Sequence, residues 1–321
     1  MSTTLVKALN TALHDAMADD EVLVMGEDIA ELGGVFRVTA GLHETYGSDR
    51  VINALLAESS IVGTAIGLSI RGFRPVLEVQ FDGFVYPAFN QIVSMLAKMH
   101  ARTRGAVRLP VVIRMPVGGG IGAVEHHSES NEAYFAHTAG LRVVACSNPS
   151  DGYWMLRQAI DSDDPVIFYE PKRDYWHKGE IATEPDLPLD QARITRPGRD
   201  VTLITYAGMV RPALAAAQEL AEEGIEVEVI DLRSIAPLDV ETIVESVRRT
   251  GRAVVAHEAA SYASVGSEIA ATVTEHCFTH LQAPVARLGG YNIPYPPAKL
   301  EDEHLPGIDR IKDAVVQVLS Y

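Results

Sequence analysis

The sequence predicts an α/β protein of two domains, each built on a doubly wound, mainly parallel sheet. Short apolar runs alternate with stretches of helical periodicity along most of the 321 residues. A hydrophobic content of 47% with 22% charged residues is typical of an ordered globular chain of this length. The stretch 172–197, rich in proline and mixed charge, interrupts the alternation, so we expect domains at 1–185 and 186–321.

The first domain is expected to open with an amphipathic helix over 4–17, followed by a buried strand over 22–25. Residues 53–57 are expected to be extended. Further strands are expected at 75–81, 110–115, 141–145 and 165–169. Helices are expected at 61–69, 86–99, 132–137 and 151–160. This alternation indicates mainly parallel strand pairing.

The second domain repeats the pattern after a linker without a long apolar period. Strands are expected at 201–206, 227–230, 253–256 and 284–288. Helices are expected at 210–223, 240–249, 267–277 and 311–319. Gly224 and Gly251 are placed as the residues that end helices.

Glu58 stands between a strand and a helix, where ligands bind in open α/β sheets. It can be a helix-start acid, favoured by the positive end of the helix dipole. Flanked by Leu55, Leu56 and Ile61, it can instead be a buried carboxyl whose neutral form is favoured. Such a group can exchange a proton with a ring nitrogen near neutral pH. The residues alone leave both interpretations open.

Residues 116–122 form a loop that contains four glycines. The Lys-Ser/Thr of a phosphate-binding P-loop is missing, and G-G-G-I-G matches no dinucleotide fingerprint well. A mobile loop that admits or covers a ligand is the favoured interpretation.

The segment E-H-H-S-E at 125–129 follows this loop. Adjacent histidines face opposite ways on a strand, and H-E-x-x-H is missing, so a two-histidine metal site is disfavoured. One histidine can face the cleft as a proton donor. A helix-capping His-Ser pair is the alternative.

Two later motifs are ambiguous. His257 and Glu258 end a strand, but a packed, hydrogen-bonded pair at a domain interface is favoured over a ligand site. The proline-rich segment 291–297 is either a recognition surface or a chain crossover.

Composition excludes several classes of protein. A net charge of −16 argues against nucleic acid or an anionic membrane as a partner. Cys146 and Cys277 lie far apart and form no C-x-x-C motif, so neither a disulfide framework nor a zinc site is expected, and a reduced intracellular setting fits. No signal-peptide core or apolar run of about 18 residues occurs, so we expect a soluble, cytoplasmic protein.

Over essentially its whole length the chain resembles the beta subunit of the thiamine-diphosphate-dependent, decarboxylating component of a 2-oxo acid dehydrogenase. The matching segments include V-M-G-E-D, L-L-A-E-S, H-H-S-E, D-D-P-V-I-F-Y-E-P-K, E-V-I-D-L-R-S-I-A-P-L-D and G-Y-N-I-P-Y-P. Gln80, the F-Y-E-P-K segment at 168–172 and G-R-A-V-V-A-H-E-A at 251–259 resemble the branched-chain members more than the pyruvate members.

The resemblance implies a transketolase-like pyrimidine-binding domain and a transketolase C-terminal-like domain. It implies that this subunit holds the aminopyrimidine half of thiamine diphosphate, whereas a partner alpha subunit holds the diphosphate and Mg²⁺. The G-D-G of that second site is not found in this sequence. The implied enzyme is an α2β2 heterotetramer that decarboxylates a small branched-chain 2-oxo acid and passes the acyl group to the lipoyl group of a dihydrolipoyl acyltransferase. A pyruvate or acetoin dehydrogenase subunit and a non-catalytic assembly subunit are the alternatives.

The resemblance also implies roles for particular residues. Glu58 matches the cofactor-activating glutamate and His127 the active-site histidine, a proton donor during acyl transfer. Glu27 matches an acid that relays protons between paired sites. The residues that match the lining of the aminopyrimidine pocket are Leu56, Gln80 and Phe84.

Relatives of this kind also carry a structural potassium ion held largely by backbone carbonyls. The matching positions are Val111, Ala159, Ile160, Ser162 and Asp164. Ser162 departs from the usual aspartate, a change that carbonyl ligation tolerates.

Overall fold

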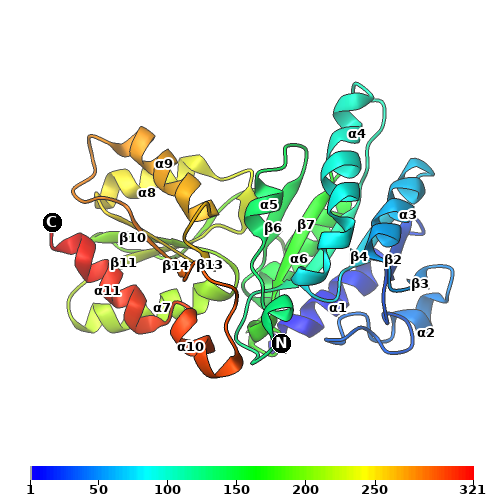
Figure 1. Cartoon of the computed structure of the whole chain (residues 1–321), viewed down its shortest axis with the longest axis horizontal. Coiled ribbons are helices and arrows are strands. Elements are labelled where there is room, and N and C mark those ends of the chain that lie inside the picture. The colour runs from blue at the N-terminus through cyan, green and yellow to red at the C-terminus, as the bar shows by residue number, and fades with distance from the viewer. Residues whose placement is uncertain (1) are drawn as a thin grey trace.

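The structure, a computed structural model that describes residues 2–321, contains two sheets with helices on both faces of each (Figure 1). The larger sheet has, in spatial order, β12 (Ser234–Ala236), β6 (Arg142–Ala145), β7 (Val166–Pro171), β5 (Val112–Val117), β4 (Arg74–Glu78), β2 (Val22–Gly26) and β3 (Val51–Asn53). All of these strands pair in parallel except β12.

The smaller sheet has, in spatial order, β14 (Ala286–Gly290), β13 (Ala253–Ala260), β10 (Val201–Thr205), β11 (Val227–Asp231) and β9 (Arg193–Arg196). Its strands are parallel except for β9 at one edge. A two-stranded antiparallel ribbon joins β1 (Ser2–Thr4) to β8 (Lys178–Glu180). The predicted fold class, two mainly parallel α/β sheets, is confirmed.

Helices cover the sheets because each presents one apolar stripe to a face of a sheet. The larger sheet packs α1 (Leu5–Ala16) and α6 (Pro149–Asp161) on one face, and α3 (Glu58–Ile70), α4 (Ala97–Arg102) and α5 (Glu132–Ala136) on the other. The smaller sheet packs α7 (Val210–Glu222) and α11 (Ile308–Leu319) on one face, and α8 (Val240–Thr250) and α9 (Val265–Cys277) on the other. Short helices are α2 (Leu42–Tyr46) and α10 (Glu301–His304). Among residues 2–321, no helix has the length and apolar content needed to cross a bilayer.

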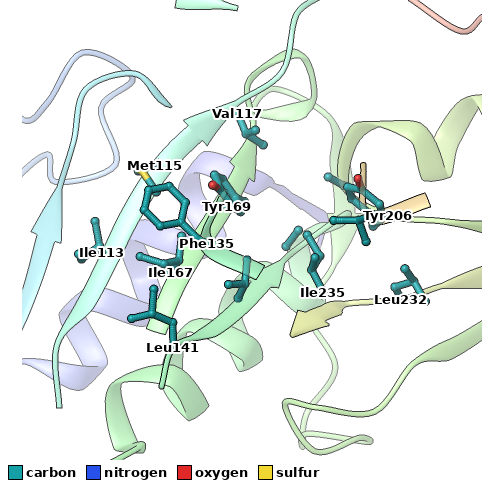
Figure 2. Close-up of a cluster of buried hydrophobic side chains, with 14 of the residues drawn as sticks. Ile113, Met115, Val117, Phe135, Leu141, Ile167, Tyr169, Tyr206, Leu232 and Ile235 are labelled. Atoms are coloured by element: carbon teal, nitrogen blue, oxygen red, sulfur yellow. The ribbon is translucent and has the colours of Figure 1, made fainter. Parts of the chain in front are cut away.

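One apolar core runs through both halves of the chain. Figure 2 shows Met115 and Tyr169 of the larger sheet in the same cluster as Tyr206, which follows β10 of the smaller sheet. Ile235, from β12 in the second half of the chain, packs into this cluster while its strand pairs with β6. The two halves therefore bury apolar surface against each other, and this burial favours one relative placement.

Two local expectations were wrong, and two short strands in the linker were missed. Residues 86–99 do not form a regular α-helix: Tyr86–Ala88 is a 3₁₀ turn and Gln91–Leu96 a π-helical stretch that leads into α4. The linker contains β8 and β9, which are short, polar and mostly at edges, so they have no strong apolar alternation. The strand near residue 53 ends at Asn53, so 54–57 are not part of it.

A buried ion network joins the three central strands of the larger sheet. Arg114 on β5 donates two hydrogen bonds to Glu170 on β7, at 2.7 and 2.9 Å, and one to Glu78 on β4, at 2.9 Å. Tyr175 donates to Glu170 at 2.6 Å. The Arg114 side chain is 1% exposed, and burial raises the pKa of Glu78 although Arg114 opposes this effect. One guanidinium thus compensates two buried carboxyls, of which Glu78 is 7% exposed and Glu170 is 0% exposed.

Replacing Arg114 by methionine leaves both carboxyls buried without their cation. Removal of one partner from a buried ion pair costs about 3–5 kcal/mol, so Arg114→Met is expected to lower the free energy of unfolding by about that amount. Urea denaturation followed by circular dichroism measures the change. Arg71→Met, at an exposed position with no side-chain hydrogen bond among the described residues, is the control and should change stability by less than about 0.5 kcal/mol. Equal stability of the two variants would contradict this assignment.

Candidate active site

The carboxyl edge of β2 is the point where the strand order of the larger sheet reverses. The chain leaves β2 for β3 on one side and then returns to β4 on the other. Gly26, the last residue of β2, is level with Asn53 of β3 and Glu78 of β4. Ligands bind at such switch points, outside the carboxyl ends of the strands. The residues that follow these three strands therefore form the candidate site.

Glu58 is the first residue of α3 and is 9% exposed. Its position matches the helix-start interpretation and also lies at the switch point. Leu55 and Leu56 were expected to bury it, but they are 88% and 75% exposed, and Ile61 is the buried neighbour. The backbone turns away between β3 and α3, which leaves both leucines on the surface. Within residues 2–321 the Glu58 carboxylate accepts no side-chain hydrogen bond, so it is available to a ligand.

Acids gather beside Glu58 at the end of β2. Burial raises the pKa of Glu27, and repulsion from Asp28 and Glu58 raises it further. Gln80, two residues after β4, donates to the Asp28 carboxylate at 3.4 Å. Glu27, Glu58 and Gln80 thus lie at one edge, where burial and the like charges favour retention of a proton on Glu27.

His127 packs against aromatic rings. Its ring centroid lies 4.4 Å from that of Phe81 and 5.1 Å from that of Phe84. Its Nδ1 atom is buried and has no hydrogen-bond partner in the described part of the chain. Burial, then the neighbouring His126 and Lys172, lower the pKa of His127.

Two expectations about the histidine pair were wrong. His126 and His127 lie on a 3₁₀ helix, Glu125–His127, and not on a strand, so their rings lie side by side with centroids 4.4 Å apart. No side-chain capping bond forms there, and the Ser128 hydroxyl has no partner among residues 2–321. The capping interpretation is therefore wrong. No cluster of three or more His, Cys, Asp or Glu able to hold a metal occurs in residues 2–321.

A buried ion pair near His127 was missed from the sequence. Lys172 donates to Asp82 at 2.9 Å and to the carbonyl of Pro116 at 3.2 Å, and both charged side chains are 0% exposed. The Lys172 ammonium lies 5.8 Å from the centre of the Phe81 ring. Burial raises the pKa of Asp82 to about 7 and lowers that of Lys172. The sequence offered one signal for this lysine, because Lys172 directly follows the mostly apolar strand β7.

The residue types at this edge are ones that can contact a flat heteroaromatic ring. Glu58 offers a carboxyl to a ring nitrogen, Gln80 offers polar atoms, and Leu56 and Phe84 offer apolar surface. Leu56 faces solvent, so this chain leaves an apolar side chain of the edge uncovered.

His257 and Glu258 form a packed, hydrogen-bonded pair, which is the interpretation favoured from the sequence. The His257 ring is buried, its Nδ1 lies 2.9 Å from the carbonyl of Ala259, and burial lowers its pKa to about 4. Glu258 forms an ion pair with Arg173 at 3.0 Å. This pair joins β13 to the segment that follows β7, so the motif lies where the two halves of the chain meet.

The residues expected to hold potassium already have partners. The carbonyls of Ile160 and Ser162 accept hydrogen bonds from Arg74, at 3.0 and 3.2 Å. The carbonyls of Val111 and Ala159 accept from backbone N–H groups. A guanidinium and a potassium ion would compete for the same oxygens, so the fit is poor. The potassium site stays a prediction.

Comparisons with known proteins agree on the family. The description "Transketolase, pyrimidine binding domain" matches residues 2–177, and "Transketolase, C-terminal domain" matches residues 190–311. The chain is 58% identical to the pyruvate dehydrogenase E1 component subunit beta of Leifsonia xyli subsp. xyli, over 100% of this chain and 96% of that protein. It is 54% identical to the 3-methyl-2-oxobutanoate dehydrogenase subunit beta of Mycobacterium tuberculosis, over 99% and 92%.

A solved structure described as a split gene transketolase, an inactive beta4 tetramer, shares the fold. The TM-score is 0.80 at 23% identity, and the match covers 98% of each chain.

The charge of Lys172 is expected to contribute to the lowered pKa of His127, after burial and His126. Lysine repels a proton on the imidazole, so Lys172→Met should raise the pKa of His127 toward its ordinary value of about 6.5. Histidine-selective NMR titration measures the shift, with Lys178→Met at an exposed position as the control. An unchanged or lower pKa in Lys172→Met would contradict the electrostatic link.

Proposed function

Because the chain belongs to the beta subunits of the 2-oxo acid dehydrogenases, we propose that it forms the pyrimidine half of an active site that oxidatively decarboxylates branched-chain 2-oxo acids. The observation that carries this proposal is the gathering of Glu27, Glu58 and Gln80 at the switch point of a pyrimidine-binding domain. The enzyme class is that of a lipoyl-acylating 2-oxo acid dehydrogenase.

Thiamine diphosphate is the cofactor implied by the pyrimidine-binding domain, and an alpha partner is implied by the beta-subunit relatives. We assign the diphosphate and Mg²⁺ to the alpha subunit of an α2β2 heterotetramer. The exposure of Leu56 supports this division, since a partner can cover this apolar side chain. The acyl acceptor is the lipoyl group of a dihydrolipoyl acyltransferase.

Bound thiamine diphosphate supplies the nucleophilic carbon and the electron sink for decarboxylation. Glu58 holds a proton at the pyrimidine ring nitrogen and takes it back. Leu56, Gln80 and Phe84 orient the ring and exclude water from one face. Glu27, whose pKa is raised, carries protons between Glu58 and its surroundings.

His127 acts in the second half of the reaction as the proton donor during acyl transfer. Its buried Nδ1 has no hydrogen-bond partner among residues 2–321, so this atom is free to hold a proton. The lowered pKa makes the protonated imidazole a stronger acid, and it also leaves less of the imidazole protonated at neutral pH.

Different observations favour branched-chain 2-oxo acids and pyruvate as the substrate. Gln80 and the segment 168–172, which contains Lys172, resemble the branched-chain members. The 58% identical relative is named as a pyruvate dehydrogenase subunit, which favours pyruvate as the second candidate. We also propose that the domain boundary lies at 185/186, between the end of β8 at Glu180 and the start of β9 at Arg193.

Co-expression with the alpha subunit decides the substrate. The complex is expected to turn over 3-methyl-2-oxobutanoate with a kcat/KM at least about tenfold above that for pyruvate, and the chain alone should give no turnover. Carbon dioxide release with an artificial electron acceptor is the measurement. A preference for pyruvate would refute the branched-chain assignment while leaving the enzyme class intact.

Glu58→Gln keeps the shape of the side chain but cannot supply and recover a proton. Loss of a positioned acid–base group costs about 10²–10⁴ in rate, so turnover of the complex should fall by that factor with the fold preserved. The same decarboxylation assay and thermal melting measure the two effects. Glu241→Gln, in the first turn of α8, is the matched control. Normal turnover with lowered stability of Glu58→Gln would mean that this residue is only a helix-start acid.

A further inference from the structure

Three motifs that the proposed function leaves unused meet at one place: the glycine loop, the H-E pair and the proline-rich segment. The glycine loop opens a longer excursion, residues 118–129, which we call the histidine loop because it carries His127. The N–H of Gly118 donates to the carbonyl of Glu129 at 2.9 Å and closes the excursion at its neck. The position of His127 therefore depends on what holds this loop.

Carboxylates from the second domain accept hydrogen bonds from the glycine backbone. Gly119 N donates to Glu258 Oε2 at 2.9 Å. Gly120 N and Gly122 N donate to the two oxygens of Glu301, at 2.9 and 3.0 Å. Backbone N–H groups arranged in this way form a concave site for an anion. The anions here belong to the chain itself, so in this structure the loop is held by the second domain.

The two carboxylates are themselves held in place. Glu258 Oε1 pairs with Arg173 at 3.0 Å. Tyr295, from the proline-rich segment, donates to Glu301 Oε1 at 2.6 Å, and Glu301 is buried. The backbone of Gly120 adopts a φ of +86°, in the region that favours glycine, which explains why this loop is rich in glycine.

The opposite side of the histidine loop packs on the first domain. A Cβ atom at Gly83 would lie 2.2 Å from the carbonyl oxygen of His126, so the 3₁₀ turn Asp82–Phe84 touches the loop backbone directly. The His127 ring lies against Phe81 and Phe84 on that side. The loop is thus clamped between the two domains.

We propose that Glu258 and Glu301 are positioning residues, which fix the histidine loop through its glycine N–H groups and so place His127 for acyl transfer. The part about acyl transfer rests on the proposed function of His127. A displacement of about 1 Å at a reacting group can cost about 10²-fold in rate, so loss of this clamp should be visible in the acyl-transfer step.

The test uses the complex with the alpha subunit and compares Glu301→Ala with Glu303→Ala, an exposed acid on the same short helix. Hydrogen–deuterium exchange of the peptide covering 118–129 reports on the clamp without reference to catalysis. Exchange is expected to be at least about tenfold faster in Glu301→Ala and unchanged in Glu303→Ala. Tyr295→Phe removes only the hydroxyl that donates to Glu301, so the exchange rate of the same peptide should rise by a smaller factor. This variant provides the test if Glu301→Ala does not assemble with the alpha subunit.

Two rate assays separate positioning from general damage. In Glu301→Ala, acylation of the lipoyl acceptor is expected to fall about 10–100-fold, whereas decarboxylation with an artificial acceptor should stay within about threefold of wild type. Unchanged exchange in a folded variant, or equal loss of both rates, would overturn the proposal. His127→Asn in the same assays tests the proposed role of His127 separately: normal lipoyl acylation there would refute that role, while the exchange result would still decide whether the carboxylates hold the loop.

Discussion

The structure depends on the compensation of charge at the carboxyl edges of its parallel strands. Arg114 is buried between Glu78 and Glu170 and joins β4, β5 and β7. Lys172 and Asp82 form a second buried ion pair, closer to His127. Buried charges are tolerated only when paired and hydrogen-bonded, so these contacts hold neighbouring strands of the larger sheet together. The site residues take their positions from those strand ends.

The sequence predicted the fold class and most elements because apolar periodicity is strong where helices and strands bury one face. It failed where tertiary contacts decide the local structure. β12 has three residues and pairs with β6 only because the second half of the chain packs on the first. The π-helical stretch in 91–96 and the edge strand β9 carry no distinct local pattern.

The acids of the candidate site could be predicted from the sequence. The residues around them could be predicted only in part. Glu27 follows a strand that the apolar pattern identifies, and Glu58 follows a stretch that was expected to be extended, so their shared edge could be inferred although the strand bounds near residue 53 were wrong. The Lys172–Asp82 pair could not, because residues 90 positions apart meet only in the folded sheet. The carboxylate partners of the glycine loop come from the other domain, and no local rule connects Glu301 to Gly120.

A crystal structure of the complex with its alpha partner and bound thiamine diphosphate tests the placement of the pyrimidine site most directly. The distance from the Glu58 carboxylate to the nearest pyrimidine ring nitrogen is the decisive measurement. We predict a hydrogen bond of about 2.6–3.2 Å, with Leu56 and Phe84 in contact with the ring. A pyrimidine ring bound elsewhere, with Glu58 turned away from it, would contradict this placement.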